Sequence, residues 1–530
     1  MFVATLLAND LGDRFMTSVT LYVVSLMFLA RDVTHSEDLF LAGRLVALAI
    51  FWINLVLMAV ATGVRLRSLR GLVALVAAAT LTPVWDYGFE IRHDNVLLTA
   101  LLLTWLLLRV WNWGRLSFFL VGVLSIAAEL VAVKAFFYFT PLTICAVLGL
   151  AAPPRNDGAR VPRLSAALAW CAGAAVAAIV FRIGYSAFGV WDLYARDVAG
   201  IFSLADGADR FLPIATLLRV VHQSPLLVAV AAIGCGQMAA GFRSDWPRIR
   251  RTLVPEAVLV LIALAALVMN PAPHPYNLLN FVPFLFLFGY RSLLLVLEKA
   301  HSPTLSAVFV VSLIVLATHL GLFAMTTKRH LAMTNERQRS LMVAAEALTD
   351  PDKDFVFDGI GMVPSRRSIS REWLVHGLFV KKLRSSPASS VREMLRQTPA
   401  SVLIQSYRTD WLDPEDHAFI RSRYIPLSDE FWLLGGTLER GGGTFEVVHP
   451  GRYIVMLSTQ ASQIGVEPTG PPIVVDGKAA IDGIVHLTEG PHSIECPPEA
   501  MATVVWIGPT LRELPRIGPG DHRRLFVNWY

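Results

Sequence analysis

A long series of apolar runs constrains this chain more than any other feature of its sequence. The runs are 43–64, 72–88, 95–110, 117–132, 137–151, 164–182, 224–241, 253–269, 277–297 and 305–326, and a weaker run, 15–30, precedes them. A helix needs about 20 apolar residues to cross a bilayer. The runs therefore predict a polytopic all-α membrane domain of 10 to 11 transmembrane helices over residues 1–326.

The composition agrees with a membrane protein and excludes several other classes. Hydrophobic residues make up 55% of the chain and charged residues only 16%. An ordinary cytosolic enzyme or a disordered chain would be far more polar. Four cysteines in 530 residues also argue against a disulfide scaffold. The net charge of +5 does not point to a nucleic-acid partner, because the excess arginine lies in short loops between the runs.

The loops between the runs predict the orientation of the domain. Loops that begin near Arg65, Arg109, Arg155 and Arg243 are rich in arginine, and they alternate with loops 89–94, 133–136, 183–223 and 270–276, which carry acids, histidine and aromatic residues. The positive-inside rule places the arginine-rich loops in the cytoplasm. The other loops then face outward, and residues 327–530 follow an outward-going last span.

Residues 327–530 contain no run long enough to span a bilayer and predict a soluble extracytoplasmic domain. Apolar stretches at 354–358 and 401–405 indicate an α/β segment over 327–430. Short strands separated by turns, including a hairpin turn at Asp476-Gly477, indicate a β-sandwich-like part over 431–530. The Asp358-Gly-Ile-Gly361 stretch is a weak phosphate-loop signal, and an ordinary α/β turn explains it better.

Polar residues in the outward loops are the candidate functional residues, because ionisable groups at a membrane boundary are costly unless they are solvated or paired. Arg92, His93 and Asp94 form either a solvated loop end or an acid/base site. Lys134, in an apolar setting, either extends to the interface or binds a phosphate. His274 and Tyr276 follow a proline-rich turn at the start of a span.

Four stretches carry a resemblance to a known superfamily. They are Arg44-Leu-Val-Ala-Leu, Ile91-Arg-His-Asp-Asn-Val-Leu-Leu, Glu129-Leu-Val-Ala-Val-Lys134 and His274-Pro-Tyr-Asn-Leu-Leu-Asn-Phe-Val-Pro283. In order and sidedness they resemble the GT-C superfamily of polytopic glycosyltransferases. Within it, they are most similar to the bacterial branch of protein mannosyltransferase-like and lipid A aminoarabinose or galacturonic acid transferases. The resemblance covers roughly residues 40–330.

The resemblance implies an inverting glycosyl transfer at the outer face of a bacterial cytoplasmic (inner) membrane, with the C-terminal domain in the periplasm. The donor would be a polyprenyl-phosphate sugar and the acceptor an envelope lipid, glycan or protein. A carboxylate would act as general base on the acceptor hydroxyl, and cations would stabilise the leaving phosphate. Lys134 and His274 are expected to bind that phosphate, with Arg92 and His93 beside it and Tyr276 against the isoprenoid or sugar. No resident cofactor is expected. No group of His, Cys and Asp residues in the sequence has metal-ligand spacing, so no metal is expected. A divalent cation held by carboxylates and phosphate is left open.

The position of the general base is where this chain departs from the superfamily pattern. If 15–30 is a full span, the first outer loop is short and Asp38 is the preferred base. If 15–30 is re-entrant, the superfamily's first span is missing and Asp13 is preferred, whereas Asp94 matches the second outer loop and supports the site. The candidate acids are Asp10, Asp13, Asp32, Glu37, Asp38 and Asp94.

Two other classes of function remain. The chain is either an inactive or shortened relative that binds or assembles envelope glycans, or a transporter of polyprenyl-linked sugars. No internal repeat favours the transporter.

Overall fold

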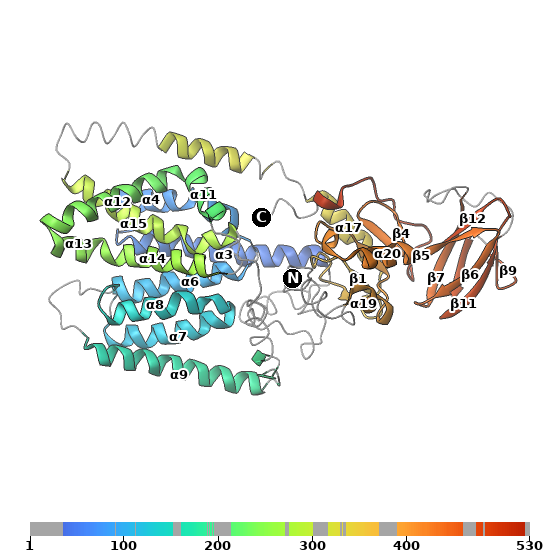
Figure 1. The fold of residues 1–530 in the computed structure, drawn as a ribbon, viewed down its shortest axis with the longest axis horizontal. Helices are drawn as coiled ribbons and strands as arrows, with labels where there is room; N and C mark the ends of the chain where they lie inside the picture. The colour runs from blue at the N-terminus through green and yellow to red at the C-terminus, as the bar shows by residue number, and fades with distance from the viewer. Residues whose placement is uncertain are drawn as a thin grey trace. The chain divides into compact units, whose positions relative to one another are not determined.

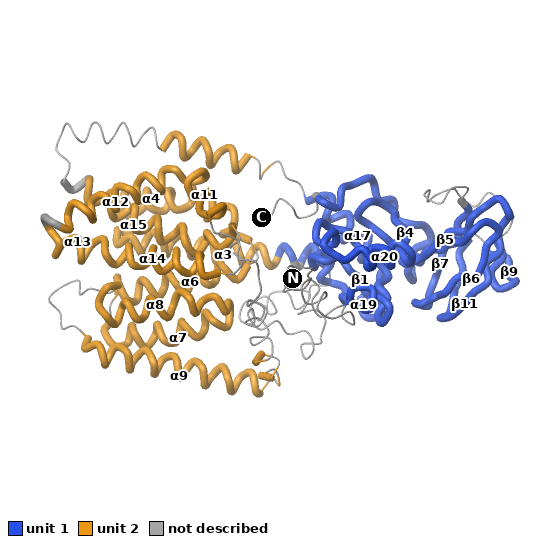
Figure 2. Tube along the Cα trace, in the orientation of Figure 1, with its two compact units in different colours: residues 1–14, 30–41, 334–530 blue, residues 15–29, 42–333 orange. Residues whose placement is uncertain are grey.

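The computed structural model divides the chain into two compact units (Figure 2). Unit 1 comprises residues 1–14, 30–41 and 334–530, and unit 2 comprises 15–29 and 42–333. The main division therefore falls near the boundary predicted at 326/327. The residues that the structure describes are 35–90, 92–111, 113–151, 161–187, 189, 191–192, 194–195, 214–270, 275–299, 316–328, 331, 335–369, 390–458, 473–480 and 483–524.

Helices make up the described part of unit 2, and most follow the predicted apolar runs. They are α3 (Ser36–Ala61, in this unit from Ala42), α4 (Leu69–Ala79), α5 (Thr82–Tyr87), α6 (His93–Leu106), α7 (Arg115–Val131), α8 (Phe136–Val147), α9 (Arg163–Ala187), α11 (Ile214–Gln223), α12 (Pro225–Ser244), α13 (Trp246–Thr252), α14 (Val254–Met269), α15 (Val282–Lys299), a helix over 316–328, and the short turns η2 (Leu107–Trp111), η3 (Val133–Ala135) and η4 (Pro275–Asn280).

Several of these helices are long and apolar enough to cross a membrane. In the described residues there are five: Ser36–Ala61, His93–Trp111, Arg163–Ala187, Pro225–Phe242 and Pro275–Val296, and a sixth if α13 and α14, which meet at a 52° bend, form one span. The prediction of 10 to 11 spans is thus matched only in part. Run 15–30 and the start of run 305–326 lie outside the described residues.

Run 72–88 does not form the single span that its composition predicts. The structure divides it into α4 and α5, with Thr80 ending the first helix and Leu81 in an extended conformation before the second. Pro83 lies at the start of α5, where its missing N–H is tolerated. The 11 residues of α4 rise only about 16 Å, about half of the hydrocarbon core of a bilayer.

Close helix packing brings α7 against α9, which lie side by side in Figure 1. A Cβ atom on Gly122 would collide with the carbonyl oxygen of Trp170, and one on Gly173 with that of Phe119. Glycine at both positions lets the two backbones approach, as is common between transmembrane helices. The other side of α9 exposes large apolar side chains, which suit contact with lipid: Leu164, Leu168, Ile179, Val180 and Ile183.

Unit 1 contains two β-sheets, and its described α-helices all precede residue 431. Its helices include α17 (Glu336–Leu348), α19 (Val391–Gln397) and α20 (Pro414–Arg423). One sheet has the order β10-β7-β12-β5-β3-β1-β2 with β4 beside β5, and the other has the order β6-β11-β8-β9. The strands are β1 (Phe355–Phe357), β2 (Arg367–Ser368), β3 (Val402–Ile404), β4 (Tyr424–Pro426), β5 (Phe431–Arg440), β6 (Gly442–Val447), β7 (Gly451–Ser458), β8 (Val474–Val475), β9 (Lys478–Ala479), β10 (Ile484–Leu487), β11 (Gly490–Glu495) and β12 (Met501–Trp506).

Strand β5 joins the α/β part to the β-rich part, so the boundary predicted at 430/431 falls at the edge of a strand within one sheet. Residues 431–434 of β5 pair with β3 and β4, whereas residues 435–440 pair with β12. Buried side chains from both parts form one core, among them Phe357, Leu433, Tyr453 and Val504. The described residues of 327–430 therefore share their core with the β-rich part.

Two turns in unit 1 explain local sequence signals. Asp476 and Gly477 have φ of 49° and 76° and connect the antiparallel strands β8 and β9, which confirms the predicted hairpin turn. In the Asp358 loop, the Asp358 carboxylate accepts hydrogen bonds from the N–H groups of residues 360–363, at 2.5–3.0 Å. The amides that would bind a phosphate in a phosphate loop are thus occupied by the protein's own carboxylate.

Candidate functional site

Aromatic packing holds the loop that carries the predicted site. The rings of Phe51, Trp85 and Phe89 contact one another edge to face, with centroids 5.5–6.3 Å apart. Gly88 lies between them, and a Cβ atom there would collide with the carbonyl oxygen of Val84 and the ring of Phe51. This packing fixes the turn between α5 and α6, so the polar residues that follow it have a defined position.

Asp94 is the centre of a buried ionic cluster in unit 2. It lies in the first turn of α6, and its side chain is fully buried. Lys134 of η3 donates a hydrogen bond to Asp94 Oδ1, while Arg92 Nε lies 3.3 Å from Oδ2. His93 Nε2 lies 3.8 Å from the same oxygen. The Lys134 side chain is only 18% exposed, so both members of this ion pair are largely removed from solvent.

The short turn η4 supplies the other side of the cluster. Asn277 Oδ1 accepts a hydrogen bond from Lys134 at 2.8 Å, and Asn280 Nδ2 donates one to Asp94 Oδ1 at 3.2 Å. The Arg92 guanidinium lies 3.4 Å from the ring centroid of Tyr276, a cation–π contact. The structure thus brings together Arg92, His93, Asp94, Lys134 and Tyr276, which the sequence predicted as site residues.

Three residues of the cluster were not among the predicted site residues. Glu90 is buried, and its Oε2 lies 3.9 Å from Arg92 Nε. Burial raises the pKa of Glu90 to about 7, against the opposing charges of Arg92 and Arg44. Asn277 and Asn280 are also buried. Their spacing of three residues, which places both on one face of a helical turn, is the sequence signal that would have identified them.

The remaining predicted residues are not part of this cluster as far as the structure describes them. Asp38 lies exposed in the first turn of α3, in the portion of that helix that belongs to unit 1. Glu37 pairs with Arg339 of the same unit at 2.8 Å. The other predicted site residues and candidate acids lie outside the described residues: Asp10, Asp13, Asp32 and His274.

A second buried charge cluster lies at the other end of the helix formed by α6 and η2. Arg109 and Arg291 each place Nε 3.6 Å from Oε1 of Glu256, whose side chain is 1% exposed. Asp94 and Arg109 are 15 positions apart in this helix, which corresponds to about 22 Å of helix rise. Charged groups therefore lie at the two ends of this helix, and buried leucines and Trp105 fill the length between them.

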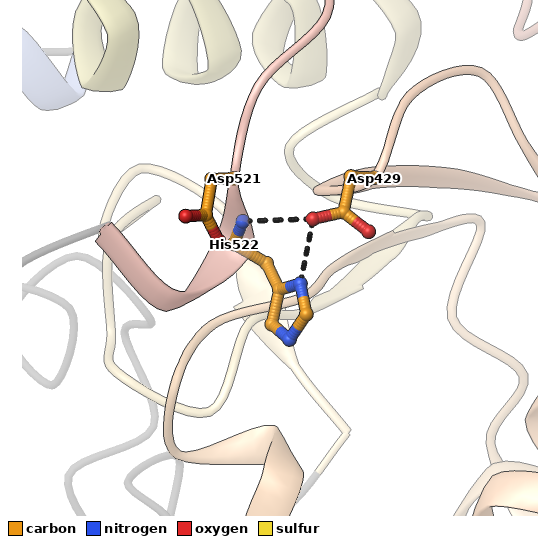
Figure 3. A group of neighbouring side chains, drawn as sticks. All are labelled: Asp429, Asp521 and His522. Atoms are coloured by element: carbon orange, nitrogen blue, oxygen red, sulfur yellow. Dashed lines mark hydrogen bonds and ion pairs between the residues drawn. The ribbon is translucent and has the colours of Figure 1, made fainter.

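In unit 1, Asp429, Asp521 and His522 place potential metal-ligand atoms within 4.8 Å of one another (Figure 3). His522 Nδ1 is 2.7 Å from Asp429 Oδ2, and Nε2 is 2.9 Å from Asp410 Oδ1. Burial alone would lower the pKa of His522, but these carboxylates outweigh it and raise the pKa. A metal ion there would have to displace the proton and these hydrogen bonds from the nitrogens of His522. The sequence could not reveal the group, because 93 residues separate Asp429 from His522.

No family model, curated protein or solved structure matches this chain.

Proposed function

We propose that this chain is an integral membrane glycosyltransferase that transfers a sugar from a polyprenyl-phosphate donor to an extracytoplasmic lipid, glycan or protein acceptor, with inversion. The observation that carries the proposal is the meeting of Arg92, Lys134 and Tyr276 around the buried Asp94. These residues come from three of the four stretches on which the GT-C resemblance rests. The fourth, at Arg44, contributes a positive charge near Glu90.

The charges of the cluster suit a phosphate. Arg92 and Lys134 carry two positive charges, whereas Asp94 carries one negative charge and Glu90, whose pKa is raised to about 7, carries only part of another. Arginine and lysine are the side chains that bind phosphate best, the former through its planar fork and the latter as a point charge. In a largely buried site, such cations stabilise the negative charge that develops on a leaving phosphate.

Unsatisfied polar atoms in the same place suit a sugar. Among the described residues, Asn95 Oδ1 and Asn280 Oδ1 are buried and have no hydrogen-bond partner. Buried amide oxygens normally accept a hydrogen bond, so each needs a donor such as water or a ligand hydroxyl. Tyr276, beside Arg92, offers an aromatic ring of the kind against which sugars and isoprenoid chains pack.

One observation favours a second function, in which the chain binds the polyprenyl-phosphate sugar without transferring it. Both carboxylate oxygens of Asp94 are engaged, Oδ1 by Lys134 and Asn280 and Oδ2 by Arg92. A carboxylate held in this way orients its cations but is a poor proton acceptor. A binding or assembly protein for envelope glycans would need only those cations.

The two functions differ in one measurable product. The purified chain in lipid nanodiscs is incubated with radiolabelled polyprenyl-phosphate hexoses and pentoses and a bacterial envelope extract, and free polyprenyl phosphate is measured. Transfer releases it, and Arg92→Ala should reduce the release by at least about 100-fold because a buried phosphate contact is lost. Arg65→Ala, which changes an exposed arginine, is the matched control. Donor binding without release would favour the binding function, and neither binding nor release would refute the proposal.

A further inference from the structure

Glu90 differs from Asp94 in how its carboxylate is held. Its backbone is fixed, because its carbonyl oxygen accepts hydrogen bonds from Asn95 Nδ2 at 2.6 Å and from the N–H of Arg92 at 2.8 Å. The carboxylate itself has only the Arg92 contact at 3.9 Å, which is too long for a hydrogen bond. Among the described residues, no donor therefore occupies the oxygens of Glu90.

The Glu90 side chain is also accessible to a small extent. It is 10% exposed, whereas that of Asp94 is completely buried. An acceptor hydroxyl can thus contact Glu90 but cannot reach Asp94 without displacing Lys134 or Arg92. Of the two carboxylates beside the proposed phosphate site, only Glu90 is free to take up a proton.

The surroundings of Glu90 also tune its acidity. The raised pKa, about 7, makes Glu90 half ionised near neutral pH, where proton transfer by a general base is most efficient. Burial is the main cause, and neighbouring acids act in the same direction, whereas two arginines oppose it. The charged and titratable groups near Glu90 are Arg44 on α3, Asp86 and Tyr87 on α5, and Arg92 and Asp94 at the start of α6.

We propose that Glu90 is the general base of the transfer reaction and that Asp94 is a positioning residue for Lys134 and Arg92. This inference rests on the proposed glycosyl transfer. In the step, the acceptor oxygen forms a bond to the anomeric carbon as the bond from that carbon to the phosphate oxygen breaks. The bonding electrons leave with the polyprenyl phosphate, and the hydroxyl proton passes to Glu90. Water then takes the proton from Glu90, which restores the carboxylate.

The protonation of Glu90 can be tested without any knowledge of the substrates. Dicyclohexylcarbodiimide modifies protonated carboxyl groups in apolar surroundings, and peptide mass spectrometry locates the adduct. In the full chain in nanodiscs, Glu90 should be modified at about pH 5, and the modification should fall about tenfold per pH unit above about pH 7. Glu90→Gln should remove the adduct from that peptide. The inference would be overturned if Glu90 carried no adduct at about pH 5, or if the adduct were lost as the pH rose toward 5.

The catalytic role is tested separately by the release of polyprenyl phosphate. Glu90→Gln should lower kcat by about 10²–10⁴-fold, leave the KM for the donor within about threefold and abolish the rise in rate through neutral pH. Glu90→Asp should restore part of the rate. An active parent with an unaltered Glu90→Gln rate and pH profile would refute the role of Glu90 and leave the proposed transfer standing. An inactive parent would refute both, and the carbodiimide result would still report the protonation of Glu90.

Discussion

At the scale of single residues, the contacts of Asp94 would serve both the stability of the fold and the proposed function. Removing an ion from water is costly, and in unit 2 Lys134, Arg92 and Asn280 compensate for this cost at Asp94. A variant that removes one partner leaves a buried charge with weaker compensation. Loss of activity in Lys134→Ala would therefore mix a lost phosphate contact with a destabilised fold.

A double-mutant cycle separates the two parts. Asp94→Asn and Lys134→Met should each destabilise the chain by about 3–5 kcal/mol, because each removes one partner of a buried charge. The double variant should recover more than half of that loss, since the Lys134 ammonium is gone and Arg92 keeps its contacts with Glu90 and the Tyr276 ring. Thermal unfolding in detergent micelles measures these differences, with Glu336→Ala, an exposed change in unit 1, as control. Single variants that cost less than about 1 kcal/mol would show that solvent reaches the pair.

At the scale of elements, the start of α3 is anchored inside unit 1. The Glu346 carboxylate of α17 accepts hydrogen bonds from the Ser36 N–H at 2.7 Å and from Ser365 Oγ at 2.5 Å. The first N–H groups of a helix lack partners within the helix, so a carboxylate placed there caps α3. Burial alone would raise the pKa of Glu346, but these hydrogen bonds lower it below its usual value.

Glu346→Ala should release this anchor. The loss of the buried hydrogen bonds is expected to cost about 1–3 kcal/mol and to speed amide exchange at residues 37–41, measured by mass spectrometry of the full chain. Glu336→Ala on the same helix is the matched control. Because the folded-state pKa is lowered, the stabilisation is present above the usual pKa of a glutamate and is lost as the pH falls below it. Equal exchange in Glu346→Ala and the parent would contradict the anchor.

At the scale of the whole molecule, the charges at the two ends of the α6–η2 helix agree with a membrane-embedded unit 2. The clusters around Asp94 and Glu256 are separated by about 22 Å of helix rise, less than the hydrocarbon thickness of about 30 Å. In each cluster the buried carboxylate is paired with two cations of the protein, as expected of ionisable groups near lipid. The apolar outer side of α9 points to the same environment.

Sidedness is tested with an impermeant thiol reagent on a variant that lacks the four native cysteines. Cysteine at Thr444 in unit 1 should be labelled in intact cells, whereas cysteine at Arg67 or Arg250 should be labelled only after lysis, because arginine-rich loops remain in the cytoplasm. All three positions are exposed. The nearby Gly442 is not a suitable position for the introduced cysteine, because its φ is 100° and a Cβ atom there would collide with the carbonyl oxygen of Ile494. Labelling of the cysteine at position 444 only after lysis would contradict the predicted topology.

The sequence by itself predicted most of the described apolar helices, the strands at 354–358 and 401–405 and the hairpin turn at Asp476-Gly477, because hydrophobic length, periodicity and turn residues are local properties. It also predicted Arg92, His93, Asp94, Lys134 and Tyr276 as site residues. Only the tertiary structure decided that Lys134 and Asp94, 40 residues apart, form a buried pair, and that Glu90 beside them lacks a hydrogen-bond donor among the described residues. It likewise joined the two parts of unit 1 through β5. Burial and pairing depend on which distant segments meet, and no local pattern contains that information.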